Sequence, residues 1–217
     1  MRYTYNKNAF ATIQTEAEAY WLGFLLADGY ISDSNCAKPF IQIKLGQKDK
    51  DHLIKFAKFL NYNSLDVIKN TTGGAYTKDN PCCVIKISCR QMSQNLDKYG
   101  LHGAKSGAEI PYILNNVELE KHYIRGIIDG DGWIRETQTG WGVCGSYETL
   151  QYIKDYIQNN IVDISDIHIN PHGSIFKLEM KSLEKTKKIL TYFYKDATIY
   201  LNRKFDLYNQ YYSQKIK

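Results

Sequence analysis

The segment Trp21-Leu-Gly-Phe-Leu-Leu-Ala-Asp28-Gly29 has a second version later in the chain, Ile124-Arg-Gly-Ile-Ile-Asp-Gly-Asp131-Gly132. Each segment is an apolar run with one interior glycine, and each ends in an aspartate followed by glycine. The two aspartates lie 103 positions apart, which indicates an internal duplication with one carboxylate in each copy. We therefore expect the chemistry of this chain at Asp28 and Asp131.

Composition predicts a folded protein with a mild basic excess. The chain has 217 residues, 43% of them hydrophobic, and a formal net charge of +5, which is compatible with a polyanionic partner but does not establish one. The five cysteines form no C-x-x-C pair and predict neither a disulfide framework nor a zinc site. Without an apolar leader or a membrane-length apolar run, we expect an intracellular protein of the cytoplasm or an organelle matrix, neither secreted nor membrane-bound.

Local signals predict where the two repeated segments become helices. Thr15 and Glu18 have the spacing of a capping box, and Asn115 and Glu118 repeat that spacing. The predicted helices begin near residues 16 and 116, and the D-G pairs stop them. Both aspartates then lie at helix C-termini.

The rest of each copy predicts the same order of elements. Alternating apolar and polar residues predict strands, and apolar residues at helical spacing predict helices between them. We expect an α+β fold of two pseudo-symmetric αββαββα repeats, residues 1–114 and 115–217, which form an antiparallel β saddle and pack through the two motif helices. Predicted strands include residues 40–45, 85–87 and 176–180; predicted helices are 51–60, 92–99, 148–157 and 183–194; hairpin turns are expected at Gly73-Gly74 and Pro171-His172-Gly173.

Small residues explain how the two acids meet. Gly23 and Ala27 are four apart, as are Gly126 and Gly130, so each motif helix has a smooth strip that permits close approach. Helices paired along these strips bring their C-terminal acids together. Two such carboxylates at negative helix ends need cations, so a divalent metal for phosphodiester hydrolysis is the expected partner.

The two acids also admit three other interpretations. Each D-G alone is more typical of a helix stop with a solvated aspartate, but the duplication favours a shared site. A calcium loop at Asp129-Gly-Asp131 fails, because Trp133 and Gly140 occupy ligand positions. An aspartic protease requires a different triplet around each acid.

These residues resemble the LAGLIDADG homing endonucleases, in their single-chain form with two motifs. Residues 21–29 and 124–132 match the nine-residue motif, and the order of strands and helices extends the resemblance over nearly the whole chain. The chain departs from the motif at Leu26, where an acid is common, while Asp129 retains it.

The resemblance implies a set of site residues. Asp28 and Asp131 would bind Mg²⁺, or another divalent cation such as Mn²⁺, with the main-chain carbonyls of Ala27 and Gly130. Catalytic support would come from Gln47, Lys86 and Lys177, the two lysines being treated as a symmetric pair. Cys144 aligns with Gln47 when the repeats are matched, which predicts unequal cleavage of the two strands.

Polar side chains on the outer face of the saddle would contact double-stranded DNA in its major groove. The residues expected on these faces are Gln42, Lys44, Lys69, Arg90, Arg135, Gln138, His168 and Asn170, with Lys86 and Lys177 beside them. The resemblance also implies phosphate contacts from two loops, one with Lys105 and one with Arg203 and Lys204.

The resulting hypothesis is a monomeric, site-specific endonuclease that cuts both strands of a long pseudo-palindromic target and serves intron homing. By resemblance it cuts across the minor groove and leaves short 3′ overhangs. The main alternative is a non-cleaving DNA- or RNA-binding protein, such as a maturase that binds its own intron RNA. A two-carboxylate hydrolase of small substrates is a third, and it predicts a deep pocket at the acids.

Overall fold

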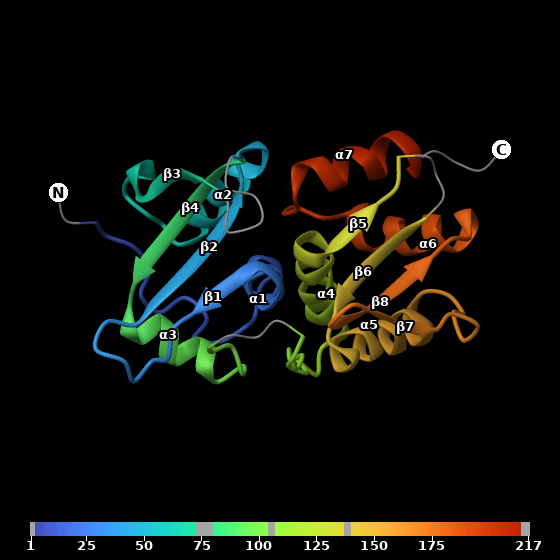
Figure 1. Ribbon diagram of the computed structural model, residues 1–217, viewed down its shortest axis with the longest axis horizontal. Helices are drawn as coiled ribbons and strands as arrows, with labels where there is room; N and C mark the ends of the chain where they lie inside the picture. The colour runs from blue at the N-terminus through green and yellow to red at the C-terminus, as the bar shows by residue number, and fades with distance from the viewer. Residues whose placement is uncertain (1–2, 73–79, 104–106, 137–139, 214–217) are drawn as a thin grey trace.

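The computed structural model describes residues 3–72, 80–103, 107–136 and 140–213. They form an α+β fold of two halves that lie side by side, each with a four-stranded antiparallel sheet (Figure 1). The strand orders, β1-β2-β4-β3 and β5-β6-β8-β7, are equivalent, so the predicted fold class is confirmed. The first half contains α1 (Glu16–Asp28), β1 (Gly29–Ile31), β2 (Phe40–Gly46), α2 (Lys50–Phe59), β3 (Ile68–Thr72), β4 (Pro81–Ser88) and α3 (Arg90–Asp97). The second contains α4 (Val117–Asp131), β5 (Gly132–Ile134), β6 (Trp141–Gly145), α5 (Tyr147–Asn160), β7 (Ile169–His172), β8 (Ile175–Met180), α6 (Leu183–Tyr194) and α7 (Asn202–Tyr211).

The two motif helices, α1 and α4, lie next to each other between the halves (Figure 1). The capping box at the start of α1 is present, because Thr15 Oγ1 accepts from Glu18 N and Glu18 Oε2 accepts from Thr15 N. The expected cap of α4 was wrong by one residue. Asn116 is the N-cap and accepts from two backbone amides, while Asn115 has a positive φ of 54°.

Strands β2 and β4 alternate between buried and more exposed residues as the sequence predicted, whereas β6 does not. In β2, Ile41 and Ile43 are buried while Lys44 is exposed, and β6 and β8 place Val143 and Leu178 in the core. The helices cover the apolar face of each sheet and leave the other face to solvent. The predicted turn after β7 contains Gly173, whose φ of 62° favours glycine. The turn expected at residues 73–74 lies outside the described residues.

Helix α7 is an element that the sequence interpretation did not predict. It follows α6 after a short extended segment and has no counterpart in the αββαββα pattern. Its buried residues are Lys204 and Tyr208. Among the described helices, none combines the length and apolar character needed to cross a bilayer.

Candidate active site

The candidate site begins at the crossing of α1 and α4, where the two backbones touch. A Cβ on Gly23 would lie 1.9 Å from the carbonyl oxygen of Tyr123, and a Cβ on Gly126 would lie 2.1 Å from that of Tyr20. The two contacts are related by the same 103-residue offset as the acids, so the crossing has pseudo-twofold symmetry. Only glycine permits this approach.

Close packing continues to the C-terminal ends, where both acids lie. A Cβ on Gly130 would stand 2.4 Å from the Cβ of Ala27 and 3.5 Å from Oδ2 of Asp28. The Asp28 carboxylate therefore lies against the residue that precedes Asp131. Asp28 is exposed and Asp131 is half-buried. The negative ends of two helices converge here, which favours a bound cation.

A shallow cavity of about 130 Å³ opens beside Asp131. Burial and the Asp131 carboxylate raise the pKa of the Cys144 thiol, so it stays protonated near neutral pH. Glu109 reaches the same cavity from the segment between the halves, and nothing in the sequence pattern indicated that. The lining residues are Ala27, Gly107, Glu109, Asp131, Cys144, Gly145 and Ile175.

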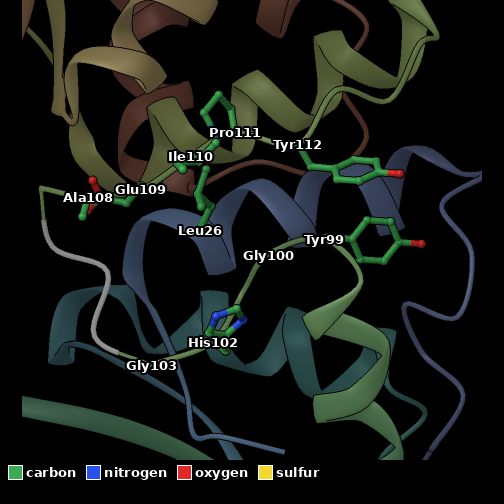
Figure 2. Close-up of a pocket in the computed structure, with 10 residues that line it drawn as sticks. All are labelled: Leu26, Tyr99, Gly100, His102, Gly103, Ala108, Glu109, Ile110, Pro111 and Tyr112. Atoms are coloured by element: carbon green, nitrogen blue, oxygen red, sulfur yellow. The ribbon is translucent and has the colours of Figure 1, made fainter.

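A larger cavity, of about 570 Å³, lies between α1 and the segment that joins the halves (Figure 2). It is lined by Leu26, by residues 99, 100, 102 and 103, and by residues 108–112. Neither Asp28 nor Asp131 lines it. Asp131 therefore borders the smaller hollow, and neither acid lines the larger cavity.

Lys204 lies beneath the two acids and corrects one sequence prediction. Its side chain is completely buried, and Nζ donates hydrogen bonds of 2.6 Å to the carbonyl oxygens of Ile128 and Asp129 at the end of α4. Burial lowers its pKa to about 8, while the carboxylates of Asp129, Asp28 and Asp131 oppose the shift. Lys204 cannot reach a DNA phosphate from this position.

Asp129, the acid that the first copy replaces with Leu26, is also buried. Its carboxylate accepts hydrogen bonds from the hydroxyls of Tyr20 and Tyr194 at 2.7 and 2.5 Å. The amide of Leu201 donates to the same carboxylate at 2.7 Å. Burial and this carboxylate raise the pKa of both tyrosines well above the usual value, so they remain donors. Asp129 therefore fixes α6 and the start of α7 against α4.

His52 extends this network into the first half. Its Nε2 lies 3.1 Å from the Tyr20 hydroxyl, and burial lowers its pKa to about 3, so the ring is neutral. Because Tyr20 gives its only hydroxyl proton to Asp129, His52 donates from Nε2.

The outer sheet faces hold most of the expected DNA-binding side chains. Lys44, Lys69 and Lys86 are exposed on the first sheet, where Gln42 is half-buried. Lys86 Nζ lies 3.7 Å above the ring of Phe40. On the second half, Arg135, His168 and Asn170 are exposed, and Lys177 is half-buried.

The charges on the second sheet form a compact group. Glu179 accepts from Arg135 at 2.5 Å and lies 3.3 Å from Lys177. These ion pairs hold the guanidinium and the ammonium group over the open face of the sheet.

The sheet register corrects two correspondences between the halves. Gly29 opposes Ile43 and Gly132 opposes Val143, so Cys144 corresponds to Lys44 rather than to Gln47. Gln47 belongs to the three-residue 3-10 turn Gln47–Asp49 between β2 and α2, an insertion that the second half lacks.

The supposed lysine pair is likewise not symmetric. Ile43 opposes Ile85 in the first sheet, and Val143 opposes Leu178 in the second. Lys86 therefore corresponds to Glu179, and Lys177 corresponds to Val84.

Three further expected DNA contacts are Arg90, Lys105 and Gln138. Arg90 was expected on a strand face, but it begins α3, and its guanidinium donates to the carbonyl oxygens of Ser34 and Cys36 at 2.5 and 2.9 Å. Its donors therefore brace the loop after β1. Lys105 and Gln138 lie outside the described residues.

The donor set at the helix crossing fits a hard divalent cation. Within residues 3–72, 80–103, 107–136 and 140–213, no group of three or more His, Cys, Asp or Glu side chains converges as a closed metal cage. Asp28 and Asp131, with the carbonyls of Ala27 and Gly130, would supply oxygen donors only. Mg²⁺ is typically held by one or two carboxylates and completed by water and phosphate oxygens.

Solved structures share this fold over most of the chain. DUF199/WhiA from Thermatoga maritima is 14% identical with a TM-score of 0.56, and the match covers 97% of this chain and 66% of that protein. The homing endonuclease I-WcaI, bound to its DNA recognition sequence, is 10% identical over 89% of this chain and 87% of its own, with a TM-score of 0.56. Mesophilic variants of the homing endonuclease I-DmoI are 16% identical over 88% of this chain and 98% of theirs, with a TM-score of 0.55.

No protein-family model and no curated protein matches the sequence. The structural similarities, at these identities, show that the chain has the LAGLIDADG fold. They leave its activity to be argued from its own residues.

Proposed function

We propose that this chain is a monomeric, site-specific endonuclease that hydrolyses one phosphodiester on each strand of a long pseudo-palindromic DNA target. The observation that carries the proposal is the contact of α1 and α4 through Gly23 and Gly126, which supports a shared site for Asp28 and Asp131 at the ends of these helices. One chain supplies both acids, which supports action as a monomer, with residues 1–114 and 115–217 as the two repeats. An intracellular role in intron homing accords with the resemblance to homing endonucleases.

The two carboxylates would hold divalent metal, with Mg²⁺ preferred and Mn²⁺ as a substitute. When bound, the metal supplies an activated water and neutralises charge on the scissile phosphate. The protein contributes the geometry of its ligands. Ala27 and Gly130 offer carbonyl oxygens at the helix ends, and the glycine crossing fixes their separation.

Lys204 supplies a buried positive charge beneath the acids. Through Ile128 and Asp129 it holds the last turn of α4, the turn that ends at Asp131. We propose that it keeps the two carboxylates ionised and oriented before metal and DNA arrive. Its pKa of about 8 leaves it mostly protonated at neutral pH.

Gln47, Lys86 and Lys177 remain proposed supports for the attacking water and the phosphates. Gln47 has a buried Oε1 without a hydrogen-bond partner among the described residues, so this acceptor is not used within the described protein. Because Lys86 and Lys177 occupy inequivalent positions, the two strands are expected to be cut at different rates.

The open sheet faces are proposed to bind double-stranded DNA. The solvent-facing positions carry cations and amides that suit phosphates and base edges. The proposed contacts are Gln42, Lys44, Lys69, Lys86, Arg135, His168, Asn170 and Lys177.

The direct test is cleavage of a library of DNA targets with Mg²⁺, by wild type, Asp28→Asn and Asp131→Asn. Each substitution removes a ligand charge, so double-strand cleavage should fall at least about 100-fold, the scale on which loss of one charge-stabilising group acts. Asp66→Asn, at an exposed aspartate on the first half, is the matched control and should cleave as wild type does. Cleavage at the wild-type rate by both site variants refutes the proposal.

The alternative is a non-cleaving nucleic-acid-binding protein, such as a maturase for its own intron RNA. The specific observation in its favour is that DUF199/WhiA, which its name does not describe as an endonuclease, shares the fold over 97% of this chain. Specific binding of DNA or intron RNA with no cleavage in Mg²⁺ or Mn²⁺ would support this alternative.

A further inference from the structure

An ion pair joins the two halves next to the candidate site. Nε of Arg203 donates to both carboxylate oxygens of Asp49, at 3.1 and 3.0 Å. Asp49 belongs to the first half and is 8% exposed, whereas Arg203 belongs to α7 of the second half. The residues are 154 positions apart in sequence, so the contact exists only when the halves are docked.

Each end of the ion pair is adjacent to a residue of the proposed active site. Asp49 ends the 3-10 turn that begins at Gln47. Arg203 precedes Lys204, whose Nζ holds the end of α4. The pair therefore links the turn that carries Gln47 to the helix end that carries Asp131.

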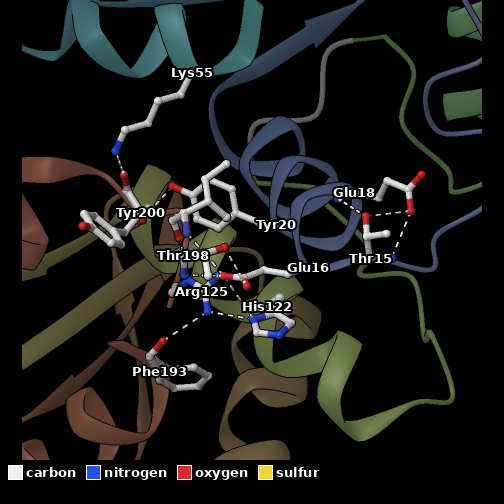
Figure 3. A network of polar contacts seen from close by, with 12 residues as sticks. Thr15, Glu16, Glu18, Tyr20, Lys55, His122, Arg125, Phe193, Thr198 and Tyr200 are labelled. Atoms are coloured by element: carbon white, nitrogen blue, oxygen red, sulfur yellow. Dashed lines mark hydrogen bonds and ion pairs between the residues drawn. The ribbon is translucent and has the colours of Figure 1, made fainter. Parts of the chain in front are cut away.

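The pair is part of a wider set of contacts made by the segment before α7. Lys55 Nζ donates to the carbonyl oxygen of Tyr200 at 2.7 Å and to Oδ1 of Asn202 at 2.6 Å (Figure 3 shows the first bond). Glu16 accepts from the amide of Thr198 at 2.8 Å and from Arg125 at 2.6 Å (Figure 3). We call residues 198–204 the C-terminal strap. It ties α1 and α2 of the first half to the second half.

The Asp49–Arg203 contact lies outside the pseudo-twofold symmetry of the two halves. Asp49 lies in the three-residue insertion that the second half lacks between β6 and α5, and Arg203 lies on α7, which has no counterpart among the described residues between α3 and α4. A contact between two added elements suggests a role that the duplicated framework does not supply.

We propose that Asp49 is a positioning residue, which acts through Arg203 to hold the Gln47 turn in register with α4. Its relation to cleavage rests on the proposed nuclease function. Asp49 is nearly buried and acts through protein contacts, whereas Gln47 would touch the attacking water. In this role Nε of Arg203 donates to Asp49 and does not bind a DNA phosphate, so DNA affinity depends on other cationic side chains.

The test compares Asp49→Ala, Arg203→Ala and the double variant, with Asp51→Ala as a control at an exposed aspartate of α2. Single-turnover cleavage should slow about 10-fold in either single variant, with no further loss in the double, because the two residues act as one unit. Asp49→Asn keeps an acceptor for Nε and should recover part of the rate. DNA affinity should stay within about twofold of wild type, with the same dependence on salt.

A phosphate-binding role for Arg203 gives a different result. Arg203→Ala alone would then reduce the slope of log affinity against log salt by about 1, and Asp49→Ala would cleave normally. That outcome overturns the inference, as do additive losses in the double variant.

Hydrogen exchange separates this inference from the proposed function. Relative to wild type, the amides of residues 47–51 should exchange faster in Arg203→Ala, to the same extent as in Asp49→Ala. If wild type does not cleave DNA but both variants show this faster exchange, the nuclease proposal fails and the positional link between Asp49 and Arg203 stands. Unchanged exchange at residues 47–51 in Arg203→Ala overturns the link, whatever the cleavage result.

Discussion

The substitution Gly126→Ala tests whether contact between the motif helices holds the two halves in register. The added Cβ would lie 2.1 Å from the carbonyl oxygen of Tyr20 and 2.8 Å from the amide nitrogen of Phe24. Both atoms belong to the backbone of α1, so no side-chain rotation relieves the clash. The helices must separate by about 1 Å to restore a normal contact.

The expected cost follows from two opposing effects. Overpacking against a rigid backbone costs about 3 kcal/mol, the upper part of the usual range. Alanine in a helix recovers about 1 kcal/mol relative to glycine. The net loss of about 2 kcal/mol should lower the melting temperature by about 4–8 °C for a chain of this length.

The assay is thermal unfolding followed by circular dichroism, with Gly46→Ala as the matched control. Gly46 has a negative φ of −60°, and a Cβ there would meet its nearest neighbour, Cγ of Lys48, at 4.0 Å. The control should be neutral or slightly stabilising. Gly23→Ala, at the symmetry-related position, should match Gly126→Ala. A Gly126→Ala protein that melts at or above the wild-type temperature refutes the close crossing.

Three further predictions use other parts of the molecule. Because the pKa of Lys204 falls from 10.5 unfolded to about 8 folded, the unfolded state binds more protons between these pH values. The stability of wild type relative to Lys204→Met should therefore rise by about 3 kcal/mol from pH 8 to 10.5, measured by denaturant unfolding. Burial alone would raise the pKa of Glu16, but hydrogen bonds from Thr198 and the charge of Arg125 outweigh it and lower the pKa. The contribution of Glu16 to the free energy of unfolding is therefore present above pH 4.5. This stabilisation should be lost as the pH falls through the lowered pKa that Glu16 has in the folded state. In Glu16→Gln, the free energy of unfolding should therefore fall less steeply at acidic pH. Lys69→Ala should reduce the salt slope of DNA binding by about 1, whereas Lys188→Ala, on α6, should not.

Local signals in the sequence were sufficient for most of the fold. The capping box of Thr15 and Glu18 specifies the start of α1 through hydrogen bonds within one turn. The alternation in residues 40–45 specifies which face of β2 is buried. Small residues four apart, Gly23 with Ala27 and Gly126 with Gly130, predicted the helix crossing, because small side chains permit close approach of two helices.

Equivalence between the halves was harder to predict, because it depends on where an insertion falls. Matching the amphipathic helices, Leu53 with Leu150, aligned Gln47 with Cys144. The strand pairing shows instead that Ile43 corresponds to Val143. The 3-10 turn between β2 and α2 accounts for the shift, and its residues carry no periodicity that marks them as inserted.

Buried charge was the feature least accessible from sequence. Asn202-Arg203-Lys204 has the polar character of an exposed helix start, yet Lys204 is completely buried. Its burial depends on the carbonyl oxygens of Ile128 and Asp129, which end a helix far away in sequence. Only the tertiary fold brings these unsatisfied helix-end carbonyls to the lysine.

The charges at the helix crossing explain why Lys204 lies there and why its single positive charge does not neutralise the site. Asp28, Asp131 and Asp129 carry carboxylates, and the ends of α1 and α4 each add about half a negative charge. Lys204 provides one buried positive charge close to all three aspartates. The remaining negative potential is directed toward the open side of the site, where Asp28 is exposed and where a divalent cation would be bound. Removing Lys204 should therefore weaken the ordering of the α4 end more than it weakens attraction for metal, because its loss makes the site more negative.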